Sequence, residues 1–201
     1  MKSVYDFIIK PVGDIYDNSI DVDGKELLLN TSIEKHKFVN NKAIVVSTPT
    51  AFKTPIKEGD EVIVHHNIFR RYYNVRGNEV NSSKFFKDNL YFCQIDQIYL
   101  YRRTKDWLAF ADRCFAMPIE NNNDLELDKE QKLIGILKYG NKSLEDKGVA
   151  EGDVIGFKPN SEFEFIIDDQ RLYCMKSNDI VIKYEHQENQ VEYNPSWAKS
   201  S

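Results

Sequence analysis

Short runs of β-branched and aromatic residues, separated by glycine, proline, asparagine and aspartate, recur along the whole chain. The breaks come at intervals of roughly 8 to 12 residues, which is typical of all-β sandwiches and barrels. The helical periodicity of apolar residues is weak throughout the chain, so long amphipathic helices are not expected. The pattern therefore predicts an all-β fold class.

Three of these runs occur twice, in the same order along the chain. The first is an apolar strand that ends in proline, the second a Gly-Asp turn leading into a strand, and the third a closing strand pair. The pairs are 6–12 with 113–119, 57–67 with 150–160, and 90–100 with 172–182. Such self-similarity indicates a repeat architecture. It predicts two tandem units, 1–105 and a shorter 106–185, followed by a polar tail at 186–201.

The Gly-Asp turns have a direct physical interpretation. Gly59 and Gly152 supply the permissive backbone that a tight turn needs. Asp60 and Asp153 are expected to accept hydrogen bonds from backbone N–H groups beside them. Both turns should therefore lead directly into strands.

A long polar segment, about 13–42, separates the first strand from the next one. Loops of this length in compact domains are usually functional or disordered. Leu27, Leu28 and Leu29 form an apolar tripeptide within it. Two interpretations stay open: a tripeptide that docks on a partner, or a buried strand that enters the core.

The composition is that of a globular protein, with 41% hydrophobic and 29% charged residues. No apolar run is long enough to span a membrane, and the N-terminus lacks the features of a signal peptide. A cytoplasmic protein without a membrane partner is expected. Cys93, Cys114 and Cys174 have no CxxC spacing and are interpreted as small core hydrophobes.

The net charge of −5 hides an asymmetry between the two halves. Residues 1–106 hold 16 Lys and Arg against 14 Asp and Glu, or +2, whereas 107–201 hold 11 against 18, or −7. Affinity for phosphates depends on an excess of Lys and Arg. The acidic total therefore predicts that nucleic acid is not a partner.

The segment 68–76 is the exception, because it interleaves Arg70, Arg71 and Arg76 with Phe69, Tyr72 and Tyr73. Such residues could stack on and neutralise a nucleic acid strand. Alternating exposure along a strand would explain the same pattern without a ligand, and this is the interpretation adopted at this point.

Metal sites are not expected. His65 and His66 are adjacent on a predicted strand, so their side chains should point to opposite faces. Asp124, Glu126 and Asp128 could share one face of an extended segment and hold a cation. A solvated acidic loop is the simpler explanation. No P-loop, G-x-S-x-G or H-E-x-x-H motif occurs, so neither an enzyme nor a cofactor is expected.

Taken in order, these features resemble the GroES or chaperonin-10 family. Its members have an opening strand of the type DRVIVKP, a mobile loop with an apolar tripeptide, a V-x-x-GD-x-V-x-F segment and a final E-x-x-Y-x-x-x-x-x-x-D-I-L-A stretch. The matching segments are 6–11, Leu27 with Leu28 and Leu29, 57–64, 148–157 and 168–180. The resemblance covers about residues 5–185.

The chain also departs from the family pattern. The segments before both Gly-Asp turns are too short for the family's roof hairpin, a loss that resembles some phage-encoded co-chaperonins. The first copy carries an insertion at about 76–85. The second copy has only 120–132 where the mobile loop should be, and its Leu125 and Leu127 alternate with acids.

The resemblance implies two tandem, partly open GroES-like β-barrels. It implies a co-chaperonin that forms a homo-oligomeric ring and closes a GroEL-type chaperonin over an unfolded client protein. Leu27, Leu28 and Leu29 would be the chaperonin-binding residues. Family rings contain seven barrels, so the number of chains in such a ring stays open.

A different class of function is the alternative. The chain could be a structural or assembly protein, viral in origin, that uses the barrels as interaction modules. The polar tail from residue 185 onward is expected to be an arm, either disordered or laid on a neighbouring subunit.

Overall fold

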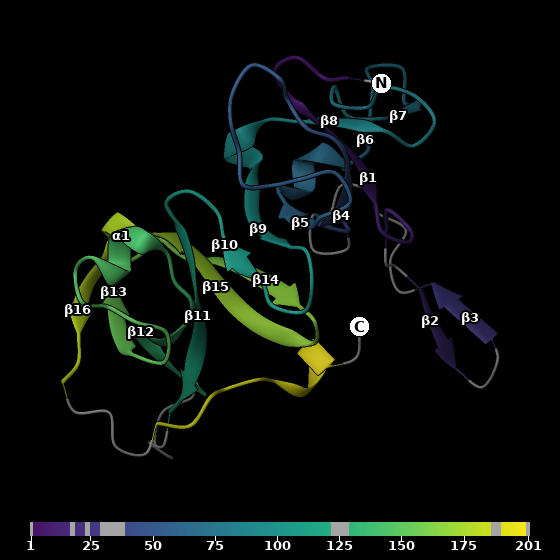
Figure 1. Cartoon of the computed structure of the whole chain (residues 1–201). Coiled ribbons are helices and arrows are strands. Elements are labelled where there is room, and N and C mark those ends of the chain that lie inside the picture. The colour runs from purple at the N-terminus through teal and green to yellow at the C-terminus, as the bar shows by residue number, and fades with distance from the viewer. Residues whose placement is uncertain are drawn as a thin grey trace. The chain divides into compact units, whose positions relative to one another are not determined.

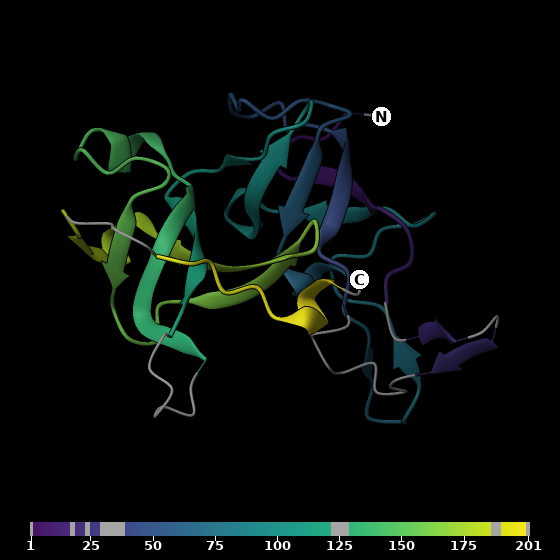
Figure 2. The same cartoon turned by 90° about the horizontal axis from the view of Figure 1, so that it is seen from below.

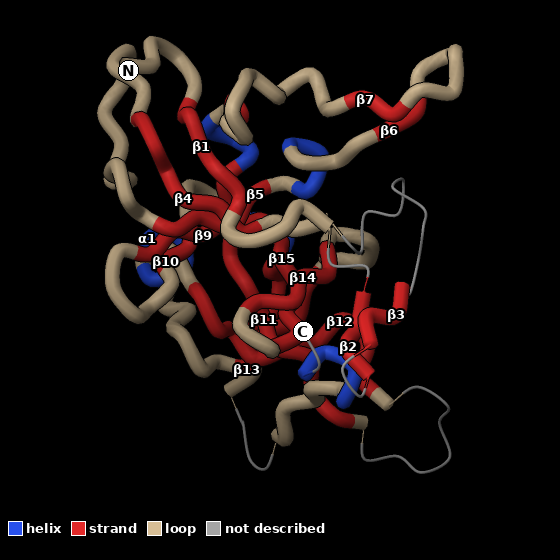
Figure 3. Tube along the Cα trace, turned by 90° about the vertical axis from the view of Figure 1, so that its right-hand side faces the viewer, coloured by secondary structure: helices blue, strands red, loops and turns tan. Residues whose placement is uncertain are grey.

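A computed structural model describes residues 2–16, 19–22, 25–28, 39–121, 129–185 and 190–199. The chain divides into two compact units, Met1–Asp106 and Trp107–Ser201. Strands make up most of the regular structure in both units, and the helices are short (Figures 1 and 3). The fold class is all-β, as predicted.

Five strands of unit 1 are neighbours in one antiparallel sheet, in the order β9-β5-β4-β1-β8. Two further strand pairs, β2 with β3 and β6 with β7, form separate two-stranded sheets. The elements are β1 (Phe7–Pro11), β2 (Ser19–Val22), β3 (Lys25–Leu28), β4 (Lys42–Ser47), β5 (Glu61–Val64), η2 (His66–Ile68), β6 (Tyr72–Tyr73), β7 (Glu79–Val80), β8 (Tyr91–Cys93), η3 (Ile95–Gln97) and β9 (Ile98–Arg102).

Unit 2 has one main antiparallel sheet with the order β14-β15-β11-β12-β13-β16. Its elements are β10 (Leu108–Ala109), β11 (Arg113–Glu120), β12 (Glu130–Tyr139), α1 (Lys142–Glu145), β13 (Val154–Phe157), β14 (Phe163–Ile167), β15 (Gln170–Lys176), η4 (Ser177–Asp179), β16 (Ile180–Lys183) and η5 (Ser196–Lys199). Across the described part of the chain, the helices are all too short or too polar to cross a membrane.

The two main sheets share strand order and register. Strands β1, β4, β5, β8 and β9 correspond to β11, β12, β13, β15 and β16. Ile9 pairs with Tyr91 in unit 1, and Ala116 pairs with Tyr173 at the equivalent place in unit 2. A bulge interrupts the ladder directly before Ile9 and directly before Ala116. The three sequence pairs thus occupy equivalent positions in the two sheets.

The Gly-Asp turns are as predicted. Gly59 and Gly152 have φ values of +88° and +90°, in the left-handed region that favours glycine. The Asp60 carboxylate accepts the backbone N–H three residues earlier at 2.8 Å, and the Asp153 carboxylate does the same at 2.7 Å. Each turn leads into the strand β5 or β13.

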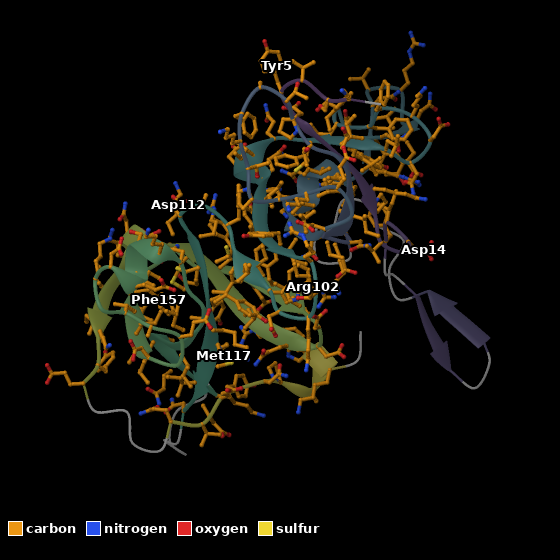
Figure 4. All side chains as sticks on the ribbon, in the orientation of Figure 1. Tyr5, Asp14, Arg102, Asp112, Met117 and Phe157 are labelled. Carbon is orange, nitrogen blue, oxygen red and sulfur yellow. The ribbon has the colours of Figure 1, made fainter. Side chains whose placement is uncertain are left out.

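Each unit has its own buried core. Side chains at most 2% exposed in unit 1 include Phe7, Ile9, Val62, Phe69, Tyr91 and Leu100; in unit 2 they include Phe115, Ile119, Leu137, Ile155, Leu172 and Met175. Figure 4 shows the side chains of both units and labels buried Phe157 and exposed Tyr5. The three cysteines are buried free thiols, as predicted, and burial raises the pKa of Cys174 to about 12.

The C-terminal residues 190–199 pack on unit 2 rather than forming a disordered arm (Figure 2, yellow). The Tyr193 backbone N–H donates to the Pro118 carbonyl at 2.9 Å, and the Glu120 N–H donates to the Val191 carbonyl at 2.8 Å. Of the two expectations, the disordered arm is therefore wrong for these residues. They extend the pairing of β11 beyond the point where β15 ends its own pairing with it.

Arg171 on β15 connects this tail to the sheet of unit 2. Its guanidinium donates to Glu164 of β14 at 2.8 Å, to Glu130 of β12, and to the Tyr173 hydroxyl at 2.7 Å. The guanidinium carbon also lies 5.6 Å from the centre of the Trp197 ring in η5. Only 11% of the Arg171 side chain is exposed. One cation thus joins β14, β12 and the tail to β15.

Candidate partner-binding loop

The long connection between β1 and β4 begins and ends in a closed stem. The Val12 backbone N–H donates to the Lys42 carbonyl at 3.0 Å, and the Asn40 N–H donates to the Ile15 carbonyl at 2.8 Å. Tyr16 forms an antiparallel bridge with Val39. The two ends of the connection are therefore held side by side.

The Asn40 side chain joins the two ends of this stem. Its oxygen accepts the Lys42 N–H at 2.8 Å, and its amide nitrogen donates to the carbonyls of Asp14, at 3.0 Å, and of Val12. Asparagine suits this position because one amide group can donate and accept at the same time. The sequence offered no sign of this role, since Asn40 is one of several asparagines in the segment.

Tyr16 connects the stem to the segment that follows β5. Its hydroxyl oxygen accepts the backbone N–H of Arg71 at 2.6 Å. Burial raises the pKa of the Tyr16 hydroxyl, which therefore stays protonated at neutral pH. The stem is consequently anchored to unit 1 at a point outside the β1–β4 connection itself.

Two of the predicted binding residues, Leu27 and Leu28, lie on β3 of the β2–β3 hairpin. Leu27 pairs with Ile20 and Leu28 pairs with Ser19, whereas Leu29 lies outside the described residues. Within the described ranges, β2 and β3 pair only with each other. Leu27 and Leu28 thus lie in a strand that pairs outside the main sheet, and the buried-strand interpretation stays open beside docking. Docking on a partner stays a prediction.

The equivalent connection in unit 2 is much shorter. Strands β11 and β12 pair as far as Glu120 with Glu130, and the Asn121 N–H donates to the Lys129 carbonyl at 2.9 Å. The connecting residues 122–128 lie outside the described residues, with Leu125, Leu127 and the three predicted acids Asp124, Glu126 and Asp128 among them.

The two histidines are not arranged as predicted. Strand β5 ends at Val64, and His65 caps η2 by accepting the Asn67 N–H at its Nδ1 at 3.1 Å. The His65 and His66 ring centres therefore lie only 4.4 Å apart instead of on opposite faces. Within the described ranges, three or more His, Cys, Asp or Glu side chains do not cluster as metal ligands would.

The basic aromatic segment 68–76 also differs from its prediction. Phe69 is fully buried, but the consecutive Tyr72 and Tyr73 are 43% and 51% exposed. The expected alternation is wrong because β6 pairs with β7 rather than with the main sheet. Among the described residues, β6 and β7 pair only with each other.

Sequence reasoning missed the exposed edge of unit 2. Val181 and Ile182 on β16 are 56% and 48% exposed, whereas the equivalent Tyr99 and Leu100 on β9 are 8% and 0% exposed. Strand β16 pairs only with β13 among the described residues. The Ile-Val-Ile run was visible in the sequence, but its position at a sheet edge was not.

Comparisons with protein-family models and with curated proteins find no match to this chain. The resemblance to co-chaperonins therefore depends on the quoted motifs. The repeated register of the two sheets is an independent observation that those motifs did not require.

Proposed function

We propose that this chain is a co-chaperonin, a lid for a GroEL-type chaperonin, with its two main sheets forming partly open barrels. One observation carries the proposal. The β1–β4 connection leaves unit 1 from a closed stem and presents Leu27 and Leu28 on a hairpin outside the main sheet. This is the arrangement that a docking loop needs.

The loop would act by placing its apolar tripeptide in a groove of the chaperonin. The stem held by Asn40 fixes where the loop begins and ends, so the loop loses less conformational freedom when it binds. Each loop contributes modest affinity, and several loops on one ring act together through their high effective concentration. Modest affinity per loop also permits the release of the lid.

Self-association into a ring would use the exposed edge of unit 2. An unpaired sheet edge with β-branched side chains is a ready template for pairing with another chain. Val181 and Ile182 give β16 that character. The enclosed client protein would contact the inner surface of the ring, and the subunit itself contributes no chemistry.

The test is capture of the chain by a GroEL-type chaperonin in the presence of ATP. Leu28→Asp should abolish capture because it places a charge in an apolar groove. The matched control is Leu125→Asp, the same change in the short connection of unit 2, which should leave capture intact. Equal capture of the wild type and the Leu28→Asp variant would remove the docking role.

The exposed β16 edge also favours the second candidate, an assembly protein that uses its units as interaction modules. Such a protein would be incorporated into a large particle and would ignore chaperonins. Native mass spectrometry of the assembled state separates the two functions, because a closed ring has a fixed, small number of chains.

A further inference from the structure

The segment between β5 and β8 is an addition to the shared fold. Unit 1 has residues 65–90 between these strands, with the β6–β7 hairpin in the middle (Figure 1). Unit 2 has only residues 158–169 at the equivalent place, with the single strand β14. The repeated sheet therefore does not require the hairpin.

The hairpin exposes aromatic and apolar side chains to solvent. Tyr72 and Tyr73 are both about half exposed, and Val75 at the tip is fully exposed. Two neighbouring rings that a fold leaves in solvent are a common feature of binding surfaces. Phe85 and Phe86, later in the same segment, are 36% and 41% exposed.

The tip of the hairpin is well braced. The Asn74 side-chain oxygen accepts the backbone N–H groups of Arg76 and Asn78 at 2.9 and 3.0 Å. The Asn74 N–H also donates to the Asn78 carbonyl at 2.9 Å. Residues on both sides of the tip are thus held in position before any ligand arrives.

The charge of this segment is opposite to that of the chain. Residues 65–90 hold five Lys and Arg against two Asp and Glu, or +3, so the remaining residues together carry −5 − 3 = −8. Arg71 pairs with Glu79 at 2.9 Å, and Lys87 lies 5.4 Å from the centre of the Phe86 ring. A shallow hollow of about 590 Å³ beside the hairpin is lined by Arg71, Glu79, Val80 and Asn81.

We propose that the β6–β7 hairpin binds a single strand of nucleic acid. The exposed Tyr72 and Tyr73 rings provide faces on which unpaired bases stack, and Arg76 with the neighbouring cations neutralises the phosphates. A duplex fits less well, because its bases are already stacked on each other. The inference revises the expectation drawn from the net charge, and it is independent of the proposed lid function.

An acidic polypeptide would be attracted by the same cations, but it has no planar bases for the two tyrosines. The rings therefore distinguish the two ligands. Binding that requires the rings indicates bases, and binding that requires only the cations indicates a general anion surface.

The experiment measures fluorescence anisotropy of labelled oligothymidylate and oligouridylate at low salt. The Tyr72→Ala/Tyr73→Ala variant should bind about tenfold or more weakly, and Tyr72→Phe/Tyr73→Phe should keep wild-type affinity because its rings still stack. Arg76→Ala should make the slope of log affinity against log salt less negative by about 0.7. Phe163→Ala, an exposed ring in unit 2, is the control and should change nothing.

Three results would overturn the proposal. The first is no saturable binding of either oligonucleotide by the wild type. The second is equal affinity of the wild type and the double alanine variant, or equal loss in the alanine and phenylalanine variants. The third is displacement of the oligonucleotide by polyglutamate at the same charge concentration, which would assign the hairpin to acidic proteins.

Discussion

The two units share one sheet but support the base of their β1–β4 and β11–β12 connections differently. In unit 1 the Asn40 amide and the Tyr16 hydroxyl hold a long connection in place. In unit 2 the C-terminal segment 190–199 lies against the base of a short one, where it is bonded to Pro118. The sheet is thus the conserved part of the repeat, and the supports around it are where the units have become different.

The equivalent strands β9 and β16 also differ. The last strand of unit 1, β9, is buried at Tyr99 and Leu100, but its counterpart β16 in unit 2 exposes Val181 and Ile182. Equal register therefore does not imply equal surfaces. Each substitution described next alters a feature that one unit has and the other lacks.

The largest expected effect is at Arg171, which has no counterpart in unit 1. Arg171→Met should destabilise unit 2 by about 3 kcal/mol, because breaking a largely buried ion network leaves Glu130 and Glu164 without their cation. Both tryptophans, Trp107 and Trp197, belong to unit 2. Denaturant unfolding followed by tryptophan emission therefore reports this unit specifically.

Lys158→Met is the control for that measurement. Lys158 pairs with Asp179 at 3.4 Å and is about half exposed, so its loss should change stability by less than about 0.5 kcal/mol. An equally small effect at Arg171 would show that the tail and strands hold together without the network.

The next effect is at Gly135 on β12, which is equivalent to Ala43 on β4. A Cβ at Gly135 would lie 2.8 Å from the Met117 carbonyl oxygen, so Gly135→Ala should cost about 2 kcal/mol through overpacking. The tryptophan-monitored unfolding midpoint measures it. The reverse change in unit 1, Ala43→Gly, should cost about 1 kcal/mol or less. Gly135→Ala without any cost would mean that the two ladders are equally spaced at this point.

The stem of the long loop should be moderately sensitive. Asn40→Ala removes three hydrogen bonds, two of them partly buried, and should weaken the stem by about 1 kcal/mol. Amide hydrogen exchange should then be about fivefold faster at Val12 and Lys42. Asn81→Ala, an exposed asparagine in the same unit, should leave both amides unchanged. Unaltered exchange in the Asn40→Ala variant would show that the backbone bonds close the stem alone.

The smallest effect on folding is expected at β16. Val181→Lys should alter stability by no more than about 0.5 kcal/mol because the side chain is exposed. A charged edge strand nevertheless resists pairing with another chain, so the variant should shift the protein toward monomer. Light scattering after size-exclusion chromatography measures the mass. The control is Leu108→Lys, which puts lysine at another exposed apolar residue of unit 2 and should leave the oligomer intact.

Local chemistry accounts for the parts of the fold that the sequence predicted. The turns at Gly59 and Gly152 were predictable because the glycine and the following aspartate form most of the turn themselves. The runs that recur in both units could be assigned to equivalent strands for a similar reason. The apolar side chains that mark each strand lie within the run itself. The all-β class followed from those runs.

Contacts between distant segments account for the failures. The hydrogen bonds of the Asn40 side chain reach carbonyls more than twenty residues away in the sequence. The position of Tyr193 depends on where β15 stops pairing with β11. The histidine pair was misplaced because β5 ends one residue before His65. The residues next to Asn40, Tyr193 and His65 in the sequence do not indicate any of these contacts.

The conserved register also has an entropic consequence. The connection 12–41 in unit 1 is roughly threefold longer than 121–129 in unit 2, yet both close the same pair of antiparallel strands. Loop-closure entropy grows only with the logarithm of length, so this difference costs about 1 kcal/mol. A single buried methylene nearly offsets it. A connection between two strands of such a duplicated sheet can therefore become longer or shorter with little change in the free energy of folding. The same holds when the added residues form a new binding segment.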